Sequence, residues 1–246
     1  MQFTYDAYRE LLSLLNQHGY EIANYYNWQT KGRCVILRHD IDSSIERALK
    51  FAALEQECGA TSTYFVLLRS DFYNVFSPKS IAQLAEIHQM GHEIGLHFDE
   101  MAYPAIIGNT AEVKKAILHE AKALESIIDL PVSTVSMHRP SKAILEADLQ
   151  IPGMINSYSN VFFKQFKYLS DSRHTWREPV MDIVKNEQYE QLHILTHAVG
   201  YCEKNTSLQE WTENFLFAAL PERWEILNQN FTNLQDVVPK SRIVKG

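Results

Sequence analysis

Asp40 and Asp42 lie two residues apart, shortly after the apolar segment Cys34–Leu37. On an extended chain, side chains two residues apart emerge on the same face, so these carboxylates would lie side by side. One of them could bind a metal ion while the other takes a proton from a nearby water molecule. The alternative is a pair of loop aspartates, with Asp42 capping the helix that follows. This segment by itself is equally compatible with both interpretations.

Two histidines follow apolar segments in the same way. His97 comes after Glu93–Leu96, and His138 comes after Val132–Met137. Imidazole nitrogens and carboxylate oxygens are common ligands of Zn²⁺. A lone histidine at the end of a strand is more often structural, but two of them together with Asp42 predict a metal site.

Asp171 and His197 also end short apolar segments, Tyr168–Ser170 and His193–Thr196. A carboxylate that is hydrogen-bonded to an imidazole fixes its tautomer and raises its pKa, which makes the imidazole a proton donor. We therefore expect Asp171 to hold His197 as a general acid. The alternative is that His197 is a hydrogen-bonded histidine of the core.

Arg139 follows His138 and precedes Pro140, where the chain must turn. A buried arginine is costly unless it is paired with an anion. An inward Arg139 would therefore hold an anion, and Asp40 is the candidate. The alternative is a surface arginine at the exit of a strand.

Apolar segments that end in reactive side chains are typical of a (β/α) barrel, whose active site lies at the carboxyl ends of the strands. Segments with helical spacing alternate with these strands, which favours a parallel sheet with crossover helices. Further strands are expected at Thr61–Leu68 and Met154–Tyr158, and Pro221 is expected to break the last helix in two. We find no internal repeat or long linker and predict a single domain over residues 1–246. The predicted helices are Tyr5–His18, Ser43–Cys58, Ser80–Gln89, Thr110–Ile128 and Ser207–Leu227.

The composition excludes several classes of protein. A formal net charge of −7 without basic runs argues against binding to nucleic acid. No stretch of about 18 apolar residues occurs, so no membrane span is expected. The first residues have neither the basic start nor the apolar stretch of a signal peptide, and we expect a cytoplasmic protein. The cysteines, which are odd in number and widely spaced, are expected to be buried thiols: Cys34, Cys58 and Cys202.

The apolar segments and the reactive residues that follow them resemble the motifs of the NodB-like polysaccharide deacetylases, carbohydrate esterase family 4, in the branch with an aspartate pair of the form HDxD. The resemblance covers about Val35 to Gly200 and implies a distorted (β/α)7 barrel with a metal-dependent hydrolase site. Five ordered motifs carry it: Leu37–Asp42 (LRHDID), Gly91–His97 (GHEIGLH), Met137–Pro140 (MHRP), Ser170–Ser172 (SDS) and Ile194–His197 (ILTH).

The resemblance also implies a role for each motif residue. Asp40 would be the catalytic base, while Asp42 and His97 would be metal ligands. The arginine of the third motif, Arg139, would orient the base. The aspartate and histidine of the last two motifs would tune and supply the general acid.

The chain departs from the family pattern at Met101, where the second motif usually has another histidine ligand. A thioether is a poor ligand for zinc, so this position does not carry over. His138 is the expected replacement because it ends the strand next to that of His97. Asp99 and Glu100 are the reserve candidates.

The resemblance implies a metal-dependent amide hydrolase that removes an N-acetyl group from an amino sugar in a polysaccharide or its precursor. Zinc is the expected metal, and another divalent ion is the alternative. One alternative is hydrolysis of a ureide or cyclic amide, as in the allantoinase-like relatives. Another is a catalytically silent barrel that binds carbohydrate. Met101, which stands where the family usually has a histidine ligand, is the reason for this alternative. Substrate-binding residues are not identified, because the aromatic side chains near the predicted rim are expected to be core rather than sugar-stacking: Phe162, Phe163, Trp176 and Tyr201.

Overall fold

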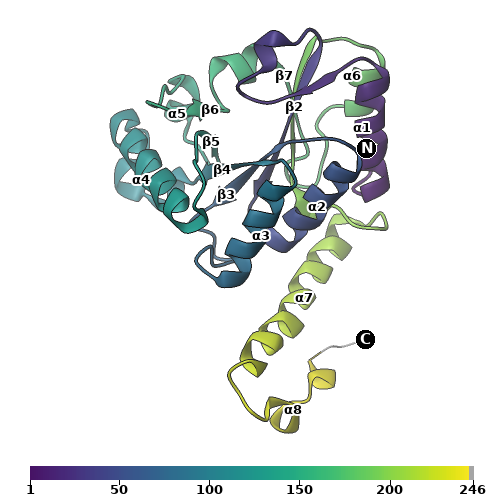
Figure 1. Cartoon of the computed structure of the whole chain (residues 1–246), viewed down its shortest axis with the longest axis vertical. Helices are drawn as coiled ribbons and strands as arrows, with labels where there is room; N and C mark the ends of the chain where they lie inside the picture. Colours follow the sequence, from purple (N-terminus) through teal and green to yellow (C-terminus); the bar gives the residue numbers. More distant parts are fainter. Residues whose placement is uncertain (244–246) are drawn as a thin grey trace. The chain divides into compact units, whose positions relative to one another are not determined.

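A parallel sheet with the strand order β6-β5-β4-β3-β2-β8-β7 forms the centre of the computed structural model, and a short strand β1 pairs with β2. All of its neighbouring strands run parallel, so the expected α/β architecture of a distorted (β/α)7 barrel is confirmed (Figure 1). Within residues 1–243, which the structure describes, β6 and β7 are the two ends of the strand path and the barrel stays open between them. The strands are β1 Glu21–Ala23, β2 Cys34–Ile41, β3 Thr63–Leu67, β4 Glu93–Phe98, β5 Thr134–Met137, β6 Ile155–Asn156, β7 Lys167–Ser170 and β8 Gln191–Thr196.

Helices follow the strands and cover the outer face of the sheet (Figure 1). Their starts follow from side-chain caps: the side chain of Ser44 accepts from the backbone of α2, and the side chain of Asn109 does the same for α4. The helices around the sheet are α1 Tyr5–Gln17, α2 Ile45–Glu57, α3 Pro78–Gln89, α4 Thr110–Ile128, α5 Lys142–Glu146 and α6 Val180–Lys185. Shorter 3-10 and π turns are η1 Trp28–Thr30, η2 Glu100–Ala102, η3 Pro104–Ile106, η4 Val161–Gln165, η5 Ala198–Gly200 and η6 Lys240–Arg242.

The chain divides into two compact units, the barrel unit Met1–Glu203 and a second unit that begins at Lys204. The second unit holds α7 Leu208–Asn228 and α8 Leu234–Val237. The expected break at Pro221 was wrong, because α7 is continuous through it. Proline removes one hydrogen bond to the carbonyl four residues earlier, but the turns on both sides keep theirs. The single catalytic domain over residues 1–246 stays a prediction.

The alternation of side chains along β2 separates the inside of the barrel from the layer between sheet and helices. Arg38 and Asp40 point inward, above a small apolar cluster, while His39 points outward toward α2. The close fit of the interior requires a glycine on β4, since a Cβ atom at Gly95 would lie 2.6 Å from the ring of Phe65. The inner cluster consists of Ala23, Tyr25, Cys34, Ile36, Phe65, Phe162 and Phe166.

Several side chains lie where the sequence did not predict them. His193 is buried inside the barrel, where its ring nitrogens lie 2.8 Å from the hydroxyl of Tyr25 and 3.1 Å from a backbone carbonyl. Cys34 is buried as expected, but Cys58 is exposed. Phe162 is a core residue, as predicted.

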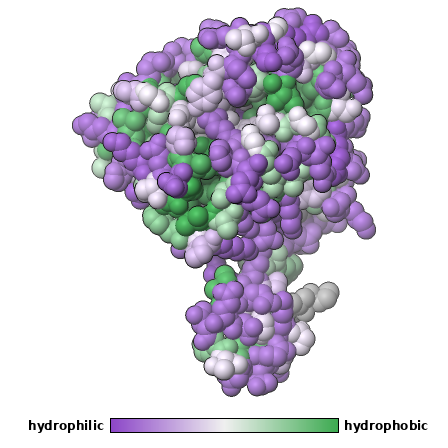
Figure 2. Space-filling view, in the orientation of Figure 1, coloured by the Kyte–Doolittle hydropathy of each residue, from purple (hydrophilic) through white to green (hydrophobic). Residues whose placement is uncertain are grey.

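The face of the molecule shown in Figure 2 is largely hydrophilic, with apolar areas between the polar ones. This agrees with a chain of ordinary hydrophobic content and a net charge of −7. Among the described residues, no helix combines the length and the apolar character that crossing a membrane requires.

Candidate active site

Asp42, His97 and His138 come together at the carboxyl ends of β2, β4 and β5, as the sequence predicted. His97 Nε2 lies 3.2 Å from Asp42 Oδ1 and 3.1 Å from His138 Nδ1, and the third side of this triangle, from His138 Nδ1 to Asp42 Oδ1, is 3.2 Å. Three ligands on a tetrahedral zinc ion at about 2.0–2.1 Å lie about 3.3 Å apart. The spacing of the three atoms fits this ion.

The chemistry of the same atoms also fits a cation. Asp42 Oδ1 is buried and, among residues 1–243, has no hydrogen bond of normal geometry, although two imidazole nitrogens lie 3.2 Å away. Burial alone would raise the pKa of Asp42, but His138 and His97 lower it well below its usual range. An ionised carboxylate oxygen and two imidazole nitrogens therefore face one point, which is the donor set that zinc prefers.

Asp40 lies beside the triad of candidate metal ligands, Asp42, His97 and His138, and is almost completely buried. Its Oδ2 accepts a hydrogen bond of 2.8 Å from Arg38 and lies 3.6 Å from His97 Nε2, while its Oδ1 accepts one of 3.3 Å from the hydroxyl of Ser136. Burial alone would raise the pKa of Asp40, but Arg38 and then His97 lower it. The carboxylate is therefore ionised and fixed in direction.

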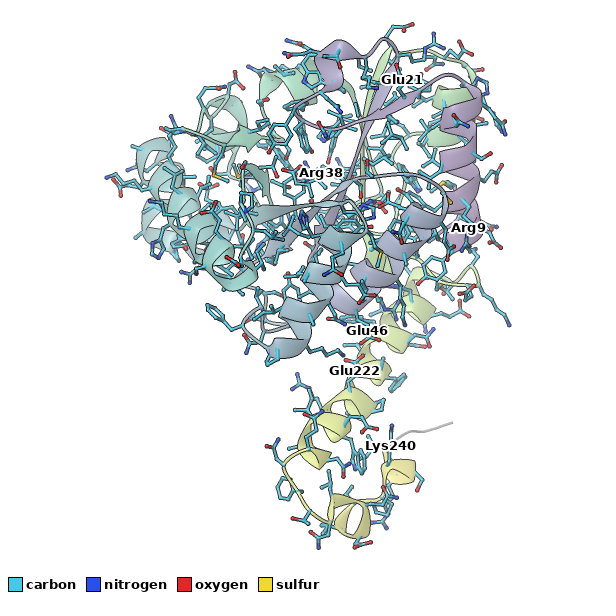
Figure 3. The ribbon with its side chains drawn as sticks, in the orientation of Figure 1. Arg9, Glu21, Arg38, Glu46, Glu222 and Lys240 are labelled. Atoms are coloured by element: carbon cyan, nitrogen blue, oxygen red, sulfur yellow. The ribbon has the colours of Figure 1, made fainter. Side chains whose placement is uncertain are left out.

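Arg38 was missed by the sequence analysis. Its side chain is fully buried in the barrel unit, where Figure 3 labels it. It donates hydrogen bonds to Asp40, to Ser136 at 2.6 Å and to Ser157 at 2.8 Å. The guanidinium also lies 5.0 Å from the ring centroid of Tyr158, within the range of a cation–π contact. The signal in the sequence was its position two residues before Asp40, on the same face of the strand.

The predicted pairing of Arg139 with Asp40 was wrong. Arg139 instead donates to both carboxylate oxygens of Asp99, and its side chain is 60% exposed. The reason is that successive side chains of an extended segment point to opposite sides. Ser136 and His138 at the end of β5 point inward, so Arg139 points outward.

The reserve candidates for the metal do not join the triad. Asp99 faces Arg139, and Glu100 accepts hydrogen bonds of 2.6 Å from the backbone of Gly108 and of Ser141. The carboxylate of Glu100 thus holds the loop after β4 against the start of α5. Met101 donates only its backbone N–H to Asp99, at 3.1 Å.

Asp171 and His197 form the predicted pair. His197 Nδ1 donates to Asp171 Oδ1 at 2.6 Å, and the backbone N–H of His197 lies 3.1 Å from both oxygens of the same carboxylate. Burial alone would lower the pKa of His197, but Asp171 raises it to about 9. The other ring nitrogen, Nε2, lies 3.8 Å from Asp42 Oδ2. A protonated imidazole therefore faces the triad from the side of β8.

No family model matches the chain, and no curated protein does. Solved structures of carbohydrate esterase family 4 are similar to it. A family 4 pseudoenzyme from Bacillus anthracis is 14% identical over 78% of this chain, with a TM-score of 0.44, and the chain spans 61% of that protein.

Two further structures are similar to the chain. The Streptococcus pyogenes deacetylase in complex with acetate is 12% identical, with 78% of this chain and 80% of that chain covered and a TM-score of 0.45. A polysaccharide deacetylase from Bacillus cereus is 16% identical, with 67% and 78% covered and a TM-score of 0.43. The roles of the site residues in this chain therefore rest on the geometry above.

Proposed function

We propose that this protein is a zinc-dependent amide hydrolase that removes an N-acetyl group from an amino sugar in a polysaccharide or its precursor. One observation carries the proposal: an ionised carboxylate and a protonated imidazole lie on two sides of the triad. Asp40 lies 3.6 Å from the ligand atom of His97, and His197 lies 3.8 Å from Asp42 on another side. Amide hydrolysis needs such a pair, because one proton must leave water and another must reach the departing amine.

Asp42, His97 and His138 would hold the zinc ion. When bound, zinc lowers the pKa of water and polarises an acyl oxygen. A set of three protein ligands is typical of catalytic rather than structural zinc sites.

Asp40 takes the proton of the attacking water. The carboxylate is suited to this because Arg38 and Ser136 fix its two oxygens, so it cannot turn away from the triad. The lowered pKa keeps the carboxylate ionised and ready to accept a proton at neutral pH.

His197 donates a proton to the amine nitrogen as the bond between carbon and nitrogen breaks. Asp171 holds the Nδ1 proton, so Nε2 is the nitrogen that faces the triad and delivers the proton. With a pKa raised to about 9, the imidazole is protonated at neutral pH, as a general acid must be. After the reaction, the proton taken by Asp40 is available to restore the acid.

The test is release of acetate from N-acetylated amino sugars by the zinc-loaded protein, compared with ring opening of a hydantoin-type substrate. Acetate release that disappears in Asp40→Asn, with zinc retained, supports the proposal. Ring opening without acetate release would assign the same site to cyclic amides instead. Carbohydrate binding without turnover of either substrate would contradict an enzymatic role.

A further inference from the structure

Glu55 is a fully buried carboxylate on α2, on the outer side of the sheet behind the candidate active site. It accepts four hydrogen bonds from side chains of α1, β2, β3 and the residue just before β3. Oε1 accepts from the hydroxyl of Tyr8 at 2.7 Å and from His39 Nε2 at 2.9 Å. Oε2 accepts from the hydroxyls of Ser62 at 2.6 Å and Tyr64 at 2.8 Å.

This arrangement requires an ionised Glu55. A carboxylate has about four acceptor positions, and here donors occupy all of them, so a carboxyl proton would have no acceptor. Burial alone would raise the pKa of Glu55, but His39 lowers it to about 2. A buried negative charge of this kind is costly unless hydrogen-bond donors surround it, as the four donors do here.

His39 bonds directly to this carboxylate. Among residues 1–243, the ion-pair partners of Glu55 are His39 and His92. His92 is neutral, because its Nδ1 accepts the backbone N–H of Ser62 at 3.2 Å, and burial lowers its pKa. The nearer imidazole is that of His39, whose Nε2 lies 2.9 Å from Oε1, against 3.7 Å between His92 Nδ1 and Oε2.

The second nitrogen of His39 reaches the neighbouring strand. Its Nδ1 lies 2.6 Å from the hydroxyl oxygen of Thr196 on β8. His39 and Thr196 are register partners, and they are the last pair of the ladder between β2 and β8. The residues that follow them are Asp40 and His197, the proposed base and acid. The side-chain link thus lies where the backbone pairing ends and the reactive residues begin.

We propose that Glu55 and His39 are positioning residues that, through Thr196, fix the spacing between the base and the acid. This inference rests on the proposed roles of Asp40 and His197. Hydrogen bonds to charged groups in a buried environment are strong and directional, so they resist a shift of one strand end against the other. Such a shift matters because a displacement of about 1 Å in a catalytic group can reduce the rate by about 10²-fold.

The test compares Thr196→Val with Tyr64→Phe. Both remove one buried hydroxyl from the same network, but only the first breaks the link between the strands. In Thr196→Val, we expect kcat for acetate release to fall about 10-fold, within the range that misplacement produces, while KM and zinc affinity stay unchanged. In Tyr64→Phe, kcat should stay within about 2-fold of wild type. Equal losses of kcat in both variants, or none in Thr196→Val, would overturn the inference.

A second measurement does not depend on turnover. The proton between His197 and Asp171 should give a downfield imidazole N–H signal in ¹H NMR of the protein, because the hydrogen bond is only 2.6 Å long. Thr196→Val should move this signal, and Tyr64→Phe should leave it in place. An unmoved signal in a folded Thr196→Val variant contradicts the positioning role. A moved signal in a protein that never releases acetate supports the positioning role and rejects the proposed function alone.

Discussion

The guanidinium of Arg38 and the carboxylate of Asp40 meet at 2.8 Å inside the barrel, although they belong to the same strand and are only two residues apart. Both side chains are almost fully excluded from solvent. The cation that orients the proposed base therefore comes from its own strand. The strand-end Arg139, which the family resemblance suggested for this task, pairs with Asp99 instead.

Replacing Arg38 should lower the free energy of unfolding far more than replacing Arg139. Arg38→Met should cost about 3–5 kcal/mol of unfolding free energy, because it leaves the buried Asp40 without its partner. Arg139→Gln should cost about 1 kcal/mol or less, since its side chain is 60% exposed. Urea denaturation measures both. Adding Asp40→Asn to Arg38→Met should recover part of the loss, and two single variants of equal stability would contradict the assignment.

Metal content should depend on each member of the triad. Asp42→Ala, His97→Ala and His138→Ala should each lose most of the bound zinc, since each removes one of three mutually adjacent ligand atoms. Elemental analysis of the purified variants checks this. Asp99→Asn is the matched control, because that carboxylate faces an arginine and should not affect the metal. Full occupancy in His138→Ala would remove this residue from the site.

Asp40→Asn should keep the metal and lose turnover. General acid–base groups contribute about 10²–10⁴-fold, and the substitution removes a base without removing a ligand. Acetate release per bound zinc is the quantity to measure. If the variant stayed near the wild-type rate, a different carboxylate would have to act as the base.

The rate should fall at high pH because the proposed acid must be protonated. The carboxylate of Asp171 raises the pKa of His197 to about 9, so kcat/KM should decline as the pH rises through about 9. In Asp171→Asn the imidazole loses this partner, and the decline should begin at a lower pH. A pH profile whose alkaline side is identical in the two proteins would show that this pair does not supply the proton.

Stability should fall in acid because of Glu55. Its pKa is about 2 in the folded protein and 4.5 without the fold, so its stabilisation is complete above pH 4.5 and disappears as the pH falls through about 2. The difference corresponds to an effect on the order of 3 kcal/mol. Unfolding free energies measured between pH 2 and 6 should show this slope, and Glu57→Gln, an exposed change on the same helix, should retain it. In His39→Gln the loss should begin at a higher pH.

Local sequence determined the strands and the residues at their carboxyl ends. Apolar segments that end in a reactive residue predicted the triad of Asp42, His97 and His138 and the pair of Asp171 and His197. These side chains come together because parallel strands bring their carboxyl ends to one edge, so position along the strand is enough to place them side by side. Their roles as metal ligands and as general acid stay predictions.

Only the tertiary structure decided which buried charges pair. Arg38 donates to Ser136 and Ser157, which are 98 and 119 residues away in sequence, and Glu55 accepts from Tyr8, 47 residues earlier. No local pattern marks such partners, because a buried charge is balanced by whichever groups the packing of several strands and helices brings within hydrogen-bonding distance.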